Sequence, residues 1–114
     1  MKKLLKAAKE GNVLAQSQLG NMYYMGIGLE QDFQKALLWY KRAGSRGDAS
    51  SQLHLSLMYI TGDGVEQNFA EAVIWLKKAA LQGHSGAKFH LGIMYKTGTG
   101  VEQDYDEAMR WFSQ

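Results

Sequence analysis

Residues 19–28 read LGNMYYMGIG, residues 55–64 read LSLMYITGDG, and residues 91–100 read LGIMYKTGTG. The three segments are spaced by 36 residues, and other positions keep the same step. Those positions hold Gln31/Gln67/Gln103, Ala36/Ala72/Ala108, Trp39/Trp75/Trp111 and Gly11/Gly47/Gly83. A period of this length indicates a solenoid, in which each unit buries its apolar face against its neighbours. The chain is therefore predicted to be an all-α solenoid of three 36-residue repeats.

Each repeat has room for two helices. Ala15, Leu19, Met22 and Tyr23 recur at the spacing of one helix face, which predicts a first helix, helix A, at about 13–25, 49–61 and 85–97. A second helix, helix B, is predicted at about 33–45, 69–82 and 105–114. In the first copy of helix B, Trp39 is expected to fill the space between units.

Turn and capping residues separate these helices. The Gly-x-Gly pairs recur because they end helix A, where a left-handed residue closes the helix. Asp32, Asn68 and Asp104 precede helix B and can cap its first turn. Glu71 and Glu107 lie three residues further on, which predicts a capping box in the second and third repeats.

The chain divides into a half-repeat and three repeats. Residues 2–11 align with 38–47, so the half-repeat at 1–11 is predicted to contain one leading helix at about 2–10. Repeats follow at 12–47, 48–83 and 84–114, the last one truncated, within a single domain. Leu4 and Ala7 at one end, and Trp111 and Phe112 at the other, lack a neighbouring unit in the sequence. We expect either end-to-end self-association or a longer array.

Composition excludes several classes of protein. The chain has no cysteine, so disulfides and thiolate metal sites are impossible. The net charge of +2 is too small to indicate nucleic-acid binding. No apolar run approaches the roughly 20 residues that span a bilayer, so membrane insertion is not expected. The N-terminus lacks a long apolar core, so a secretory signal is not expected, and a cytoplasmic location is the first expectation.

The repeat is similar to the SEL-one-like repeat, a relative of the tetratricopeptide repeat. The second copy carries the resemblance best, through Ser51, Leu55, Met58, Tyr59, Gly62, Gly64, Val65, Asn68, Ala72, Trp75, Ala79 and Gly83. The resemblance covers nearly the whole chain. It implies a right-handed superhelix of helix pairs that acts as an adaptor between proteins, common in bacteria, without a cofactor and usually without catalysis.

No residue pattern argues for chemistry. A dinucleotide-binding loop would need a preceding strand and a third glycine, which the Gly-x-Gly loops lack. His54 and His90 lie 36 residues apart, but no third ligand is placed to complete a metal site with them. Asp104, Asp106 and Glu107 fit capping better than calcium binding. No nucleophile–base pair with a supporting third group is visible, so the chain is not expected to be an enzyme.

Function should lie where the repeats differ, and these positions fall on helix A. By analogy with tetratricopeptide repeats, helix A lines the concave wall, where apolar residues that the repeat does not require would bind a peptide or a partner helix. The alternative is that the same residues pack between repeats. The predicted partner-binding residues are Asn21, Tyr24, Leu53, Leu57, Ile60, Phe89, Ile93 and Lys96.

Overall fold

The computed structural model describes residues 2–114, and this part of the chain contains helices and no strand. The helices are α1 (Lys2–Lys9), α2 (Val13–Met25), α3 (Phe33–Ser45), α4 (Ala49–Thr61), α5 (Phe69–Leu81), α6 (Ser85–Thr97) and α7 (Tyr105–Phe112). The predicted all-α repeat architecture is confirmed. Three helices end slightly earlier than predicted, α1 at Lys9, α5 at Leu81 and α7 at Phe112. Residue 1, part of the predicted half-repeat, lies outside the described residues.

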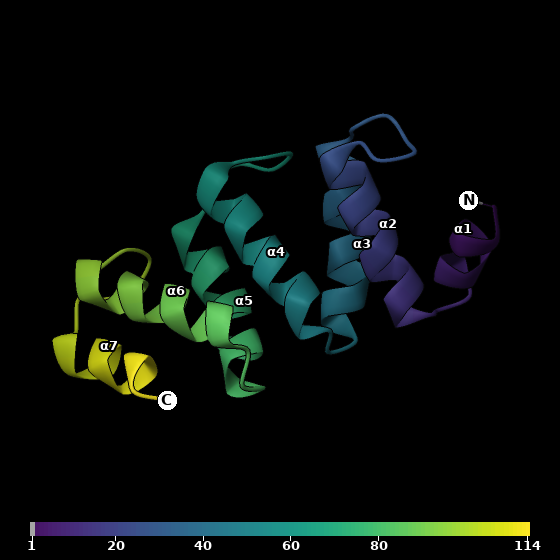
Figure 1. The fold of residues 1–114 in the computed structure, drawn as a ribbon. Coiled ribbons are helices and arrows are strands. Elements are labelled where there is room, and N and C mark those ends of the chain that lie inside the picture. Colours follow the sequence, from purple (N-terminus) through teal and green to yellow (C-terminus); the bar gives the residue numbers. More distant parts are fainter. Residues whose placement is uncertain (1) are drawn as a thin grey trace.

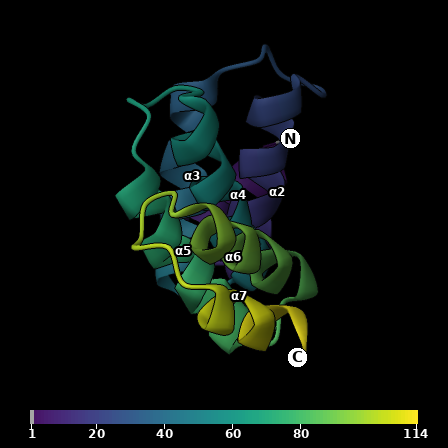
Figure 2. The ribbon, with the colours of Figure 1, turned by 90° about the vertical axis from the view of Figure 1, so that its left-hand side faces the viewer.

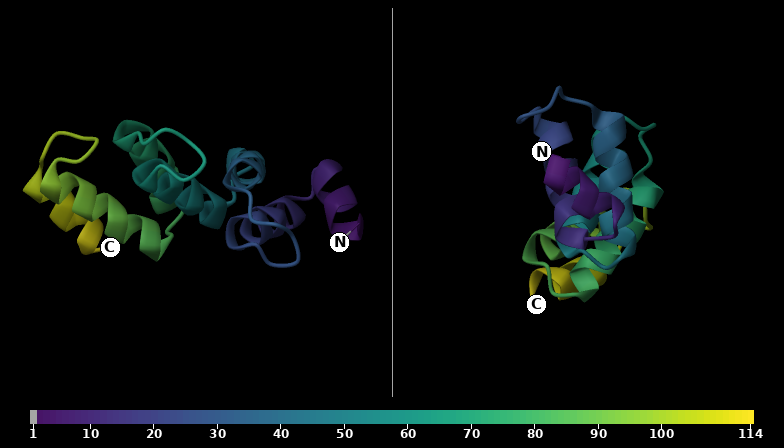
Figure 3. Two further views of the ribbon diagram at one scale, coloured as in Figure 1. Left: turned by 90° about the horizontal axis from the view of Figure 1, so that it is seen from above. Right: turned by 90° about the vertical axis from the view of Figure 1, so that its right-hand side faces the viewer.

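The helices form an elongated array with extents of 48 × 25 × 18 Å. Each helix packs against the next one along the chain, and α1 and α7 lie at opposite ends (Figure 1). Successive pairs are rotated, so that α2 and α3 stand upright while α6 lies across the view. Seen end on, α6 and α7 lie in front of α2 and α3 (Figure 2), and the view from above shows the same separation of the ends (Figure 3). The array is therefore a twisted solenoid in which contacts are mostly between neighbours.

Residues shared by all repeats make the core. Leu19, Leu55 and Leu91 are completely buried, and each such leucine contributes about 1.5–3 kcal/mol by leaving water. One cluster of buried side chains runs from α3 through α6, and a second joins α1, α2 and Trp39. The repeated sequence therefore places buried clusters along the whole array, because every unit covers the apolar face of its neighbour.

The first glycine of each loop ends helix A as predicted. Gly26, Gly62 and Gly98 have φ values of 70°, 77° and 71°, and each donates its N–H to the carbonyl four residues earlier. The loop glutamines satisfy a second carbonyl of the last turn, which explains why they recur. Their Nε2 groups donate to the carbonyls of Tyr24, Ile60 and Lys96 over 2.7–2.9 Å.

The second glycine has another role, so the prediction that both glycines end helix A is wrong for it. A Cβ on Gly64 would lie 2.7 Å from Phe33 Cβ, and one on Gly100 would lie 2.5 Å from the Phe69 carbonyl oxygen. Each of these two loops thus packs against the first residue of helix B in the preceding repeat. A side chain at the second glycine would push the two repeats apart.

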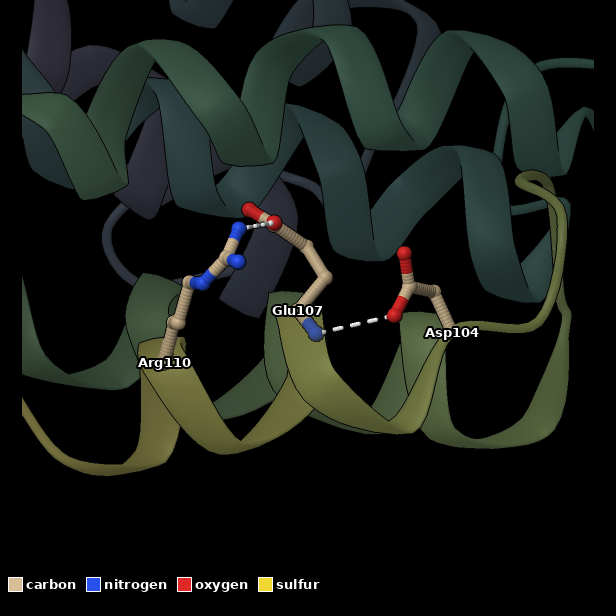
Figure 4. A network of polar contacts seen from close by, with 3 residues as sticks. All are labelled: Asp104, Glu107 and Arg110. Carbon is tan, nitrogen blue, oxygen red and sulfur yellow. Dashed lines mark hydrogen bonds and ion pairs between the residues drawn. The ribbon is translucent and has the colours of Figure 1, made fainter.

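Asp32, Asn68 and Asp104 cap helix B as predicted, each accepting a backbone N–H of the first turn over 3.0–3.1 Å. The predicted capping box is wrong. The N–H groups of Asn68 and Asp104 donate instead to the carbonyls of Tyr59 and Tyr95 at the end of helix A. Glu107 forms an ion pair with Arg110, 2.8 Å away (Figure 4). The end of the preceding helix A supplies the acceptor for the N–H group of the capping residue, so the side chain of Glu71 or Glu107 is not needed there.

Candidate partner-binding face

All eight predicted partner-binding residues lie on helix A of a repeat. Asn21 and Tyr24 are on α2, Leu53, Leu57 and Ile60 on α4, and Phe89, Ile93 and Lys96 on α6. We call the solvent-facing side of these three helices the A face.

Each helix in the part of the chain described, residues 2–114, is too short or too polar to cross a bilayer.

A polar and aromatic group lies at the beginning of the A face. The Tyr40 hydroxyl of α3 donates to Asn21 Oδ1 over 2.6 Å, and its ring stacks on His54 at 4.9 Å with an interplanar angle of 17°. The Tyr40 ring reaches this position by passing over Gly20, where a Cβ would lie 2.6 Å from the ring. Burial raises the pKa of Tyr40, so its hydroxyl stays protonated and donates to Asn21.

The same packing of an aromatic ring of helix B over a glycine of helix A recurs in the third repeat. Gly92 stands at the position of Gly20, and a Cβ there would lie 2.5 Å from the Phe112 ring. In the second repeat the equivalent positions hold Ser56 and Leu76, both completely buried. Sequence reasoning missed this group. The signal was the pairing of a glycine on helix A with an aromatic ring twenty residues later on helix B, absent only from the middle repeat.

Three of the predicted residues contribute to packing between repeats. Tyr24, Leu53 and Ile60 are half-buried and pack against the larger core cluster. The Tyr24 hydroxyl donates to Asp63 Oδ2 over 3.0 Å, and its ring lies 5.1 Å from that of Phe33. Burial, followed by the bond to Asp63, raises the pKa of Tyr24. Tyr24 thus joins the first repeat to the second, and all three residues offer a partner only part of their surface.

The others lie outside that core cluster. Leu57 and Ile93 are half-buried at equivalent positions of α4 and α6, and Lys96 is exposed. Phe89 is 56% exposed, with its ring 6.0 Å from that of Phe112. These side chains lie at sites where the repeat pattern itself does not demand an apolar residue.

The histidines are held by local contacts. Burial lowers the pKa of His54, the charge of Asp48 opposes this change, and that of His84 adds to it. His84 caps α6, accepting the Ala87 N–H at Nδ1 over 3.2 Å. Among residues 2–114, no group of three or more histidine, aspartate or glutamate side chains is arranged to hold a metal ion.

The Sel1 repeat model matches residues 13–48, 49–84 and 85–114. The chain belongs to the Sel1 repeat family. Proteins of this family are generally scaffolds for protein–protein interaction and typically have no catalytic activity of their own. No curated protein sequence matches the chain.

Three bacterial proteins of known structure are similar to this Sel1 repeat chain. A protective antigen of uropathogenic Escherichia coli with an SLR fold is 38% identical, with a TM-score of 0.95, over 96% of this chain and 24% of its own. A Sel1 repeat protein from Oxalobacter formigenes is 34% identical, with a TM-score of 0.89, over 98% and 84%. Cysteine-rich protein B of Helicobacter pylori shares the fold at 23% identity, with a TM-score of 0.75, over 98% and 85%. The chain thus spans about a quarter of the E. coli antigen.

Proposed function

We propose that the A face binds a peptide or a helix of a partner protein. The observation that carries this proposal is the position of Leu57 and Ile93. They are partly exposed aliphatic residues at equivalent positions of α4 and α6, the A helices of successive repeats, at sites that the Sel1 repeat does not reserve for its core. Phe89 extends the same apolar surface. Contiguous exposed apolar side chains on a protein surface commonly mark an interaction site.

Charge distribution supports the same face. Helices α2, α4 and α6 contain no aspartate or glutamate, and their lysines are Lys88 and Lys96. A peptide that docks here removes few charged groups from water, so the cost of desolvation is small. Apolar side chains of the partner would therefore gain most of their burial free energy.

The polar residues would orient the partner. Tyr40 occupies Asn21 Oδ1, which leaves the Asn21 amide nitrogen to donate to a peptide carbonyl. Lys96 at the other side would attract a carboxylate. Tyr24, Leu53 and Ile60 would form the floor of the site, held rigid by their packing against the core. Pre-organisation of this kind lowers the entropic cost of binding.

The test is a double variant, Leu57→Glu with Ile93→Glu, used as bait beside the wild-type chain in pull-downs from bacterial lysate with identification by mass spectrometry. We expect the variant to lose the proteins that the wild type captures, while its helical circular dichroism and melting temperature stay nearly unchanged. Two buried charges at the contact would prevent the apolar burial that drives binding.

Leu81→Glu is the matched control, because Leu81 is 78% exposed on α5 and outside the A face. It should capture the same proteins as the wild type. If the double variant unfolds, Leu57 and Ile93 serve the core and the A face is the wrong site. If it folds and captures the same proteins, the proposal fails as well.

A further inference from the structure

A second surface of the molecule carries a row of unpaired cations. It consists of Lys6, Lys41, Arg42, Lys77 and Lys78, on α1, α3 and α5, and we call it the basic row. Lys6, Arg42 and Lys78 occupy the same position of successive repeats, as do Lys41 and Lys77. All five side chains are exposed. The row therefore follows the long axis of the array, on helices other than those of the A face.

Aromatic rings hold most of these cations in place. Arg42 and Lys78 lie 4.7 and 4.6 Å above the rings of Trp39 and Trp75. Lys41 and Lys77 lie 5.9 and 5.7 Å from the rings of Tyr59 and Tyr95 in the following repeat. Such cation–π contacts restrict the side chains without neutralising their charge. The positive groups are thus partly ordered before any anion arrives.

Within residues 2–114 none of the cations of this row is ion-paired, and the one ion pair joins Arg110 to Glu107, outside the row. The recurrent acidic position of the repeat holds Glu30, Glu66 and Glu102, which lie in the loops between helices A and B. Carboxylates therefore gather at the loops before helix B, and lysines and arginines gather in its second half.

Apolar side chains accompany the cations. Leu38 and Ile74, one helical turn before Arg42 and Lys78, are 45% and 49% exposed. At α1 a surface cavity of about 480 Å³ is lined by Lys2, Leu5, Lys6, Lys9 and Glu10. The surface thus alternates positive groups with aliphatic contacts and is not purely basic.

We propose that the basic row binds an extended acidic peptide segment of a protein partner, with aliphatic side chains between its carboxylates. A segment of about a dozen residues, at roughly 3.3 Å per residue, spans about 40 Å. That is most of the 48 Å length of the array, of which the row on α1, α3 and α5 occupies only a part. A flexible chain can follow the twist of the helix pairs, whereas a planar anionic membrane would meet few of the cations at once. Single-stranded nucleic acid binds largely by stacking its bases on aromatic rings, but Trp39 and Trp75 are buried.

The probe is a fluorescein-labelled peptide of about a dozen residues, with glutamates and a leucine at every third position, followed by fluorescence anisotropy. We expect saturable binding that weakens as salt is raised. Arg42→Glu with Lys78→Glu should raise the dissociation constant at least about tenfold, since the loss involves several exposed charge contacts. The neutral pair Arg42→Gln with Lys78→Gln should act in the same direction and guards against a folding defect in the first.

Lys88→Glu with Arg110→Glu is the matched control, because it makes the same change of net charge on α6 and α7, which carry none of the row. It should bind the peptide like the wild type. Ile74→Ser should weaken the leucine-containing peptide and leave an all-glutamate peptide unaffected. Leu57→Glu with Ile93→Glu should not change the affinity, which separates this proposal from that for the A face.

Three results would overturn the inference. The first is that the peptide does not bind the wild type. The second is that the row variants and the control variant lose affinity equally, which would indicate only a response to net charge. The third is tighter binding of a single-stranded oligonucleotide, or of phosphatidylserine-containing vesicles, than of the peptide. Either would assign the row to a different anion.

Discussion

Gly64→Ala tests whether repeats are joined by close packing of loop backbone. Gly64 has a φ of 72°, and an added Cβ would lie 2.7 Å from Phe33 Cβ and 2.8 Å from the Phe33 carbonyl carbon. An alanine in the left-handed region costs about 1–2 kcal/mol. Forcing a methyl group into a closely packed contact adds typically 1–3 kcal/mol. We expect Gly64→Ala to destabilise the fold by roughly 2–5 kcal/mol.

Gly47→Ala supplies the control for backbone strain alone. Gly47 has a φ of 98°, and no heavy atom lies within 4 Å of an added Cβ. The Gly47→Ala variant should therefore lose only about 1–2 kcal/mol of folding stability. Urea unfolding followed by circular dichroism measures both variants, and their midpoints should differ by roughly 1 M.

The backbone contact makes a further distinction. Two of the three atoms nearest to the added Cβ belong to the Phe33 main chain, so Phe33→Ala should not rescue Gly64→Ala. Equal losses at Gly47 and Gly64, or full rescue by truncating Phe33, would refute close packing between the loop and the preceding repeat.

Three other predictions concern stability. Trp75→Ala should lower the free energy of unfolding in urea by about 3–5 kcal/mol, and Trp111→Ala should lower it less. The reason is that Trp75 is 8% exposed between two repeats, whereas Trp111 is only half-buried. Equal losses would contradict this view. Gly20→Ala should cost about 1–3 kcal/mol by clashing with the Tyr40 ring, and a second change, Tyr40→Leu, should recover part of that loss in a double-mutant cycle. Burial lowers the folded-state pKa of His54 below the ordinary 6.5. The contribution of neutral His54 to stability should therefore be fully present above pH 6.5 and be lost as the pH falls below it. His54→Gln should flatten this dependence in thermal melts between acidic and neutral pH.

Most of the fold could be predicted because the repeat pattern reports local and nearest-neighbour interactions. The 3.6-residue spacing around Leu19 and Leu55 placed the helices, and left-handed glycines such as Gly26 placed their ends. What escaped prediction depended on contacts between helices. The fit of Gly64 against Phe33 and the replacement of the capping box by the Tyr59 carbonyl are two examples.

The partner-binding site could be predicted only as a set of variable positions. The sequence does not distinguish a residue exposed on the A face from one packed between repeats, since both are apolar and occur at the same helical spacing. The structure distinguishes them by how much of each side chain is exposed to solvent: Ile60 packs against the core, whereas Phe89 is largely exposed. Their role in binding remains a prediction.

The sequence by itself determined the seven helices, their order and the Sel1 repeat lattice, because 36-residue periodicity and capping act within a repeat or between adjacent ones. Only the tertiary structure decided which surfaces are open to a partner. Solvent exposure depends on what the neighbouring helix covers, as when Gly20 lets the Tyr40 ring reach Asn21 and His54. The basic row likewise became a surface only when packing brought equivalent positions of α1, α3 and α5 to the outside of one array.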